Sequence, residues 1–146
     1  FQGYVIQRTQ ALLGCGPSAI SDSGGAYWQN AVDLETWTEA VTAGELPVAR
    51  GVALDADDRL RRHVIMRLMC DGRLGFAEVA ERFQLDVAAT FADELRRLED
   101  QHADLAVVDR AAGTITATPL GHHLIRNVAR VFDRHTPAGS GGSPTI

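Results

Sequence analysis

Apolar residues recur at helical spacing along the middle of the chain. Leu60, Val64 and Leu68 follow one another at intervals of four residues, as they would on one face of an α-helix. Asp55 and Asp58 precede this stripe, where negative charge suits the free N–H groups of a helix start. Two further stretches have the same periodicity. The pattern predicts three successive helices over residues 55–70, 76–83 and 86–101.

The apolar period then changes from about four to two. Residues 105–108 and 114–118 are predicted to be short strands joined by a turn at Ala112-Gly113. Thr118-Pro119 is typical of a helix start, so a last helix is predicted over residues 120–134. Three helices, a ribbon and a helix have the order of a winged-helix module. The sequence thus predicts a mainly α fold with a small two-stranded β ribbon, a resemblance that fixes no function.

The first third of the chain has weaker patterns. Leu34, Trp37 and Val41 predict a short helix that Asp33 caps, and residues 46–54 are interpreted as a connector. Residues 14–25 are rich in glycine and form a predicted loop, which is either a tight turn after a strand or a place where backbone approaches a ligand. The predicted parts are a helix and connector over 31–54, a winged-helix-like domain over 55–135 and a disordered tail over 136–146.

Composition excludes several function classes. The 146 residues are 45% hydrophobic and 23% charged, which is ordinary for a globular domain, and carry a net charge of -5. The predicted third helix holds five acidic residues against Arg96 and Arg97, so it would repel a phosphate backbone. No apolar run approaches the roughly 20 residues that cross a bilayer. We therefore expect neither a nucleic-acid partner nor a membrane span.

Cysteine and histidine spacing predicts no metal site in this chain. Cys15 and Cys70 are too far apart for a ligand cluster or a disulfide framework, and we expect free thiols in a reducing cytoplasm. No two of the five histidines have the i, i+4 spacing of paired metal ligands. No nucleophile with a readable base and no carboxylate pair is present. The residues alone predict no catalytic group in this chain.

Arginines are concentrated on two predicted helices. Arg61 and Arg62 lie on the first helix of the winged-helix-like domain, and Arg126 lies on the last. Arginine forks bind carboxylates with two parallel hydrogen bonds. These residues form either a solvated face with salt bridges to the acidic third helix, or a basic wall facing a polycarboxylate ligand or a partner domain.

Several stretches in one order resemble the C-terminal part of the oxygen-independent coproporphyrinogen III oxidases, which are radical S-adenosylmethionine enzymes. The clearest are Phe1-Gln2-Gly3-Tyr4, Gly14-Cys15-Gly16-Pro17-Ser18-Ala19-Ile20-Ser21, Tyr27-Trp28-Gln29-Asn30, Arg50-Gly51, Asp57-Asp58-Arg59-Leu60-Arg61-Arg62 and Arg126-Asn127-Val128-Ala129. The resemblance extends from residue 1 to about residue 133. Asp71-Gly72 and His135 depart from the usual family pattern.

The resemblance implies an enzyme that decarboxylates two propionates of coproporphyrinogen III oxidatively to give protoporphyrinogen IX in haem biosynthesis. Its cofactors would be two S-adenosylmethionine molecules and a [4Fe–4S] cluster held by a Cys-x3-Cys-x2-Cys motif. This chain has only two cysteines, so the cluster ligands are expected in an upstream barrel domain. Residues 1–30 would then be the last segment of that α/β barrel, and the isolated chain would be inactive and expose apolar surface.

The resemblance also implies site residues. Ile20, Gln2 and Phe1 would contact S-adenosylmethionine, Ile20 foremost, which favours the ligand-wall interpretation of the glycine-rich loop. Arg61, Arg62 and Arg126 would bind substrate propionates, and the winged-helix-like domain would cover the barrel mouth and exclude water. Two alternatives stay open: a related haem chaperone, and a winged-helix protein-interaction module without catalysis.

Overall fold

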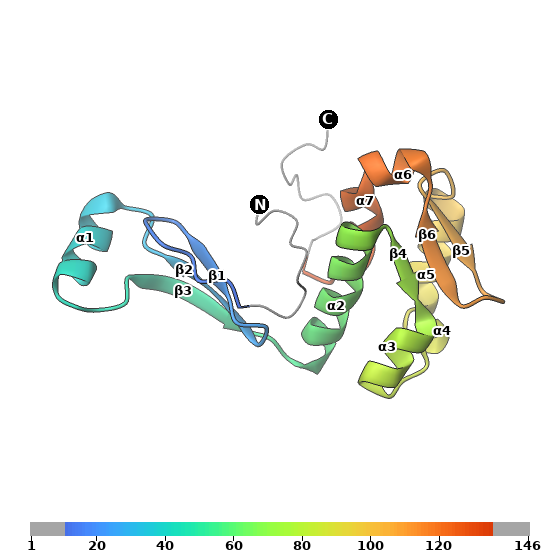
Figure 1. Cartoon of the computed structure of the whole chain (residues 1–146), viewed down its shortest axis with the longest axis horizontal. Helices are drawn as coiled ribbons and strands as arrows, with labels where there is room; N and C mark the ends of the chain where they lie inside the picture. The colour runs from blue at the N-terminus through green and yellow to red at the C-terminus, as the bar shows by residue number, and fades with distance from the viewer. Residues whose placement is uncertain (1–10, 136–146) are drawn as a thin grey trace. The chain divides into compact units, whose positions relative to one another are not determined.

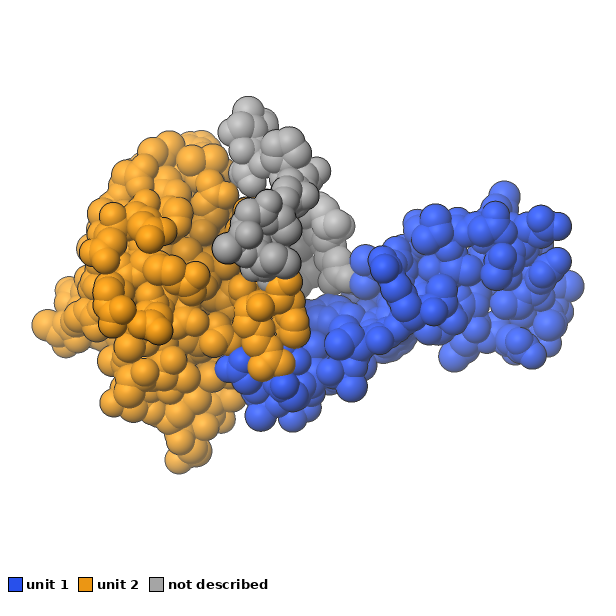
Figure 2. Space-filling model, turned by 180° about the vertical axis from the view of Figure 1, so that it is seen from behind, with its two compact units in different colours: residues 1–59 blue, residues 60–146 orange. Residues whose placement is uncertain are grey.

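The computed structural model describes residues 11–135. The chain divides into two compact units, unit 1 over Phe1–Arg59 and unit 2 over Leu60–Ile146 (Figures 1 and 2). Each contains one small three-stranded sheet. The fold is therefore mixed α/β, which corrects the mainly α prediction. Within the described residues, no helix is long and apolar enough to cross a membrane.

Unit 1 is built on an antiparallel sheet with the strand order β1-β2-β3. The strands are β1 (Ile20–Asp22), β2 (Ala26–Asn30) and β3 (Val48–Ala53), and helix α1 (Leu34–Thr42) lies between β2 and β3 in the chain (Figure 1). The predicted helix is confirmed, and Asp33 caps it by accepting a hydrogen bond from the Thr36 amide at 2.8 Å.

The strands of unit 1 correct two expectations. Residues 20–22, predicted as loop, form β1, and residues 48–53, predicted as connector, form β3. Every residue of β3 is exposed, so the strand has no buried face and no apolar alternation to indicate it. Backbone pairing with β2 holds β3 in place instead.

Unit 2 packs helices around its own sheet. The helices are α2 (Ala56–Asp71), α3 (Phe76–Phe83), α4 (Val87–Thr90), α5 (Ala92–Gln101), α6 (Pro119–His123) and α7 (Ile125–Arg130), with α2 beginning in unit 1. The predicted stripe of α2 is confirmed, because Leu60, Val64 and Leu68 are its buried residues. The Asp55 carboxylate accepts from the Asp58 amide at 2.8 Å and the Asp58 carboxylate accepts from the Asp55 amide at 3.2 Å, as in a capping box.

The core of unit 2 is contiguous and aromatic at its centre. Phe91 and Phe132 are fully buried, with ring centroids 5.3 Å apart in an edge-to-face arrangement. Leu68, Leu95 and Ile115 are equally buried around them. A side chain of this size buried in a dense core contributes about 1.5–3 kcal/mol by leaving water. Unit 2 thus has a hydrophobic core of its own.

The predicted two-stranded ribbon has a third strand. The strands β4 (Arg73–Gly75), β5 (Ala106–Asp109) and β6 (Thr114–Ala117) form an antiparallel sheet in the order β4-β6-β5. β4 has three residues, too few to display an alternating pattern. Arg110, just after β5, binds both carboxylate oxygens of Glu99 on α5 and holds the pKa of that carboxyl below its usual range.

Two long predicted helices are each interrupted. The helix expected over 86–101 is α4 followed by α5, and the last helix is α6 followed by α7. The breaks fall at Phe91 and Leu124, whose backbones leave the helical region. Neither residue is a glycine or a proline, so the sequence contains no breaker at these positions. Phe91 is drawn into the core instead, where it is fully buried.

Removing the cap of α4 is expected to lower stability by about 1 kcal/mol. The Asp86 carboxylate accepts hydrogen bonds from the amides of Ala88 and Ala89 at 2.9 and 3.2 Å. Asp86→Ala leaves both amides without this partner, whereas Asp86→Asn retains an acceptor. Urea unfolding of the chain, followed by circular dichroism, measures the difference. Equal stability of the alanine and asparagine variants would contradict the cap.

Candidate functional site

Pairing of the three strands of unit 1 creates one continuous row of side chains. Ile20 lies opposite Gln29, and Gln29 lies opposite Arg50. Tyr27 and Val52 are paired in the neighbouring row, two residues away along each strand. Residues two apart in a strand share a face. All five side chains therefore lie on the same face of the sheet.

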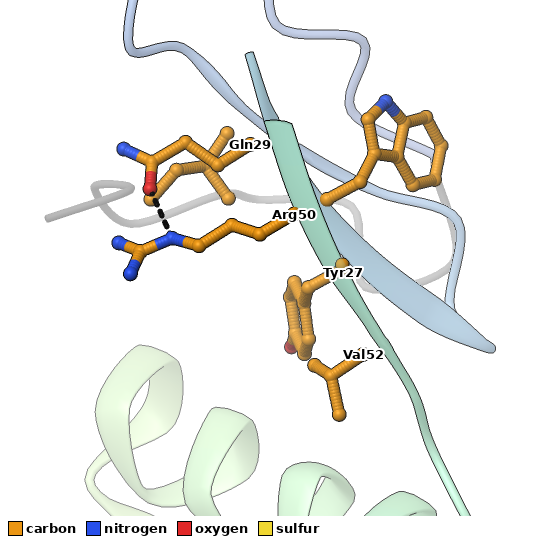
Figure 3. Close-up of a pocket in the computed structure, with 7 residues that line it drawn as sticks. Tyr27, Gln29, Arg50 and Val52 are labelled. Atoms are coloured by element: carbon orange, nitrogen blue, oxygen red, sulfur yellow. Dashed lines mark hydrogen bonds between the residues drawn. The ribbon is translucent and has the colours of Figure 1, made fainter. Parts of the chain in front are cut away.

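A cavity of about 240 Å³ lies on this part of the sheet (Figure 3). We call it the sheet groove, and its lining residues are Ile20, Tyr27, Trp28, Gln29, Arg50, Gly51 and Val52. The lining is largely apolar and contains a single charged side chain. A groove of this kind can hold an apolar body that carries one anionic group.

Arg50 is held at the groove by a short chain of hydrogen bonds. Its Nε donates to Gln29 Oε1 at 2.8 Å (Figure 3). Gln29 Nε2 in turn donates to the Ser18 carbonyl oxygen at 3.0 Å. The amide of Gln29 is thereby fixed at both ends. Within residues 11–135, no hydrogen-bond partner is found for the two terminal nitrogens of Arg50. The fork is oriented and keeps its bidentate edge available.

The glycine-rich loop is fastened to the edge of the same sheet. The Asn30 side chain donates to the carbonyl oxygens of Gly14 and Gly16 at 3.3 and 2.9 Å, and the Gly14 amide donates to Ser21 Oγ at 3.0 Å. A Cβ on Gly14 would lie 2.7 Å from the Ile20 carbonyl oxygen, so only glycine allows this close approach. The loop therefore positions the β1 backbone beside the groove.

The residues predicted to contact S-adenosylmethionine fall in two classes. Ile20 lines the sheet groove and is 37% exposed. Phe1 and Gln2 lie outside the described residues. Their predicted role stays a prediction.

The three predicted propionate partners lie in unit 2 and differ in their surroundings. Arg61 is mostly buried, with its Nη1 2.9 Å from Glu94 Oε1 and 3.1 Å from the Phe132 carbonyl oxygen. Arg62 is half-buried, and Arg126 is exposed. The structure thus engages Arg61 in an internal ion pair and leaves Arg126 the most accessible of the three.

Sequence reasoning missed Gln29 and Arg50 as a pair. Both belong to stretches that carry the family resemblance, but residues 46–54 were expected to be a connector. Without β3, nothing in the sequence brings positions 29 and 50 together. Recognising a strand at 48–53 would have placed them side by side.

A [4Fe–4S] cluster does not fit the donor set of this chain. Cys15 is exposed in unit 1 and Cys70 is half-buried in unit 2, and the two do not form a disulfide. Among residues 11–135, no group of three His, Cys, Asp or Glu side chains is placed to hold a metal ion. Three closely spaced cysteines are needed for the cluster that the resemblance implies.

Unit 1 exposes most of the large apolar side chains that the described chain leaves in solvent. Nine such residues belong to unit 1: Leu12, Leu13, Ile20, Val32, Leu34, Val41, Leu46, Val48 and Val52. Ala31 is its only buried apolar residue among those described. The described part of unit 1 therefore has almost no hydrophobic core of its own.

Comparison with known proteins identifies relatives along nearly the whole chain. Residues 54–121 match the family described as the HemN C-terminal domain. Oxygen-independent coproporphyrinogen III oxidase of Helicobacter pylori is 36% identical over 140 residues, which is 95% of this chain and 30% of that protein. The enzyme of the same name from Thermostichus vulcanus is 39% identical over 142 residues, 97% of this chain and 43% of that protein.

A solved structure agrees with the sequence relatives. Coproporphyrinogen III oxidase (HemN) from Escherichia coli, described as a radical SAM enzyme, superposes with a TM-score of 0.82 at 38% identity, over 92% of this chain and 31% of that one. The resemblance to the C-terminal part of these oxidases is confirmed. The chain spans about 30% of the length of most of the curated relatives that it matches.

Proposed function

We propose that this chain is the C-terminal segment of an oxygen-independent coproporphyrinogen III oxidase of haem biosynthesis, a cytoplasmic enzyme that oxidatively decarboxylates two propionates of coproporphyrinogen III to give protoporphyrinogen IX. The observation that carries the proposal is the continuity of the match. Relatives of that name are 36–39% identical over 92–97% of the chain. A solved relative shares the fold over the same extent, with a TM-score of 0.82.

Radical hydrogen abstraction in the complete enzyme would be supplied by a [4Fe–4S] cluster with two S-adenosylmethionine molecules. The cysteines of this chain do not fit the cluster, so its ligands would come from an upstream barrel domain. This chain would then line the reaction site, cover it and exclude water from it. We therefore expect the isolated chain to be inactive.

Unit 1 would supply a wall of the reaction site. Ile20 lines the sheet groove, which supports its proposed contact with S-adenosylmethionine. The exposed apolar residues of unit 1 support burial against the barrel. Because residues 20–30 form an antiparallel hairpin, they differ from the parallel strands of an α/β barrel.

Unit 2 would act as the cover. Its own core lets it keep a fixed shape over a radical site, from which water and stray hydrogen donors must be excluded. Its element order, helices followed by the β5–β6 hairpin and a last helical segment, supports the winged-helix-like interpretation. Of the proposed propionate partners on this unit, Arg126 has the exposure that ligand contact requires.

The test is an assay of the complete protein that carries this segment. The assay contains a reconstituted cluster and S-adenosylmethionine and excludes oxygen. We expect conversion of coproporphyrinogen III to protoporphyrinogen IX, which is measured by chromatography of the oxidised porphyrins. The matched control is the isolated chain of residues 1–146, which should convert none. If a protein with an intact cluster spectrum converts no substrate, the proposed oxidase function is wrong.

A haem titration of the same protein separates the alternatives. Tight haem binding without conversion would identify a relative that acts as a haem chaperone. Neither haem binding nor conversion would favour a winged-helix protein-interaction module. Conversion excludes both alternatives as the main activity.

A further inference from the structure

We propose that the sheet groove seats one propionate-bearing arm of the tetrapyrrole substrate, with the terminal guanidinium nitrogens of Arg50 binding its carboxylate. Gln29 is the positioning residue that orients the fork. The inference rests on the proposed function and deepens it, because it names the substrate group that this site recognises.

The fixed orientation of Arg50 supports its binding to a carboxylate. Its Nε is committed to Gln29 at 2.8 Å, and Gln29 is in turn fixed to the Ser18 carbonyl oxygen at 3.0 Å. In Figure 3 the side chains of Arg50 and Gln29 lie beside each other, joined by the hydrogen bond between them. An arginine fork held in this way loses little side-chain entropy when it binds a carboxylate.

The size and lining of the groove fit one pyrrole ring with its propionate arm. Its volume of about 240 Å³ is below the roughly 300–1,000 Å³ of a complete site for a drug-sized molecule. It accommodates one pyrrole ring with its side arm rather than a whole tetrapyrrole. Tyr27 and Val52 form an apolar wall on the same face as Arg50, which suits the ring that carries the propionate (Figure 3).

Net charge favours the substrate over S-adenosylmethionine as the partner of Arg50. The groove lining contains no carboxylate, so no lining residue neutralises the guanidinium. S-adenosylmethionine carries one carboxylate, but its sulfonium and ammonium give it a net positive charge. A tetrapyrrole with four propionates carries only negative charge. Ile20 and Arg50 lie at opposite ends of one row, about 10 Å apart at two interstrand spacings, so a ligand atom at one does not have to touch the other.

The test compares substrate affinity in the complete enzyme and its Arg50→Gln variant. Equilibrium binding of coproporphyrin III, the stable oxidised tetracarboxylate, is measured by fluorescence, together with KM and kcat for coproporphyrinogen III. We expect the Kd and the KM to rise at least about tenfold, because the variant loses the charge-assisted hydrogen bonds of the fork. The affinity for S-adenosylmethionine should change less than twofold. Arg50→Lys should recover part of the loss, since it keeps the charge without the fork.

A second probe separates carboxylate recognition from damage to the fold. The tetramethyl ester of coproporphyrin III has no charged carboxylate, so wild type and Arg50→Gln should bind it equally. Arg96→Gln is the matched control, because Arg96 lies on α5, is exposed and is paired with Asp93 at 2.9 Å. Gln29→Leu should weaken tetracarboxylate binding less than Arg50→Gln does, since it removes only the orientation.

Each outcome decides between distinct hypotheses. Equal weakening with the acid and the ester, or no weakening with either, would overturn the role of Arg50 while leaving the oxidase intact. A wild-type enzyme that neither binds nor converts the tetrapyrrole would overturn the proposed function itself. Selective weakening toward the tetracarboxylate supports the proposal.

Discussion

Gly121→Ala is expected to destabilise unit 2 by about 3 kcal/mol, at the upper end of the cost of overpacking. A Cβ at this position would lie 1.8 Å from the Leu105 carbonyl oxygen, which is backbone and cannot rotate away. The same oxygen accepts a hydrogen bond from the Thr118 amide at 2.9 Å, and Thr118 Oγ1 accepts from the Gly121 amide at 3.0 Å. Relieving the clash must therefore disturb the junction between β5 and α6.

Thermal unfolding of the chain measures this effect. For a unit of this size, about 3 kcal/mol corresponds to a fall in Tm of more than roughly 10 °C. The matched control is Gly75→Ala in the same unit, where an added Cβ meets no atom within 4 Å. We expect the control to change stability by less than about 1 kcal/mol. Similar Tm values for the two variants would refute the packing argument.

The core of unit 2 could be predicted from the sequence because its apolar pattern is periodic. Leu60, Val64 and Leu68 recur every four residues, and the structure buries all three. Helix α3 has the predicted bounds, Phe76–Phe83. Where an element is held by burying one face, the spacing of its apolar residues shows whether it is a helix or a strand.

The sheet of unit 1 could not be predicted in this way. Its third strand has no buried residue, so burial leaves no pattern at positions 48–53. The strand is specified by backbone hydrogen bonds, which every residue except proline can make. The pairing of Gln29 with Arg50 depends on that strand, so it could not be predicted either. Both residues nevertheless lie in stretches that carry the family resemblance.

Arg61 illustrates a different limit of sequence reasoning. A carboxylate ligand and a carboxylate side chain attract an arginine equally well, so the sequence left both interpretations open. The structure places Glu94 Oε1 2.9 Å from Arg61 Nη1, and the side chains are only 18% and 11% exposed for Arg61 and Glu94, respectively. The guanidinium also lies over the Phe91 ring, 5.3 Å from its centroid. These contacts tie α2 to α5 and to the centre of the core.

Arg61→Met is expected to lower the free energy of unfolding by about 3 kcal/mol, because it leaves the buried Glu94 carboxylate without its closest partner. Arg97 Nη2 is 3.8 Å from Glu94 Oε1 and can offset only part of this cost. The double variant Arg61→Met/Glu94→Leu should recover most of the stability, since a buried ion pair replaced by apolar residues is often neutral. Urea unfolding of the three proteins measures these differences.

The same variants separate the ion pair from the substrate role predicted for Arg61. A purely internal role requires that the double variant restore both stability and the KM of the complete enzyme. A propionate contact requires that KM stay raised in the double variant, more than the affinity for S-adenosylmethionine falls. Arg126→Gln is the matched comparison: Arg126 is exposed, so its loss should leave stability within about 0.5 kcal/mol. A rise in KM for Arg126→Gln alone would assign the propionate contact on unit 2 to α7.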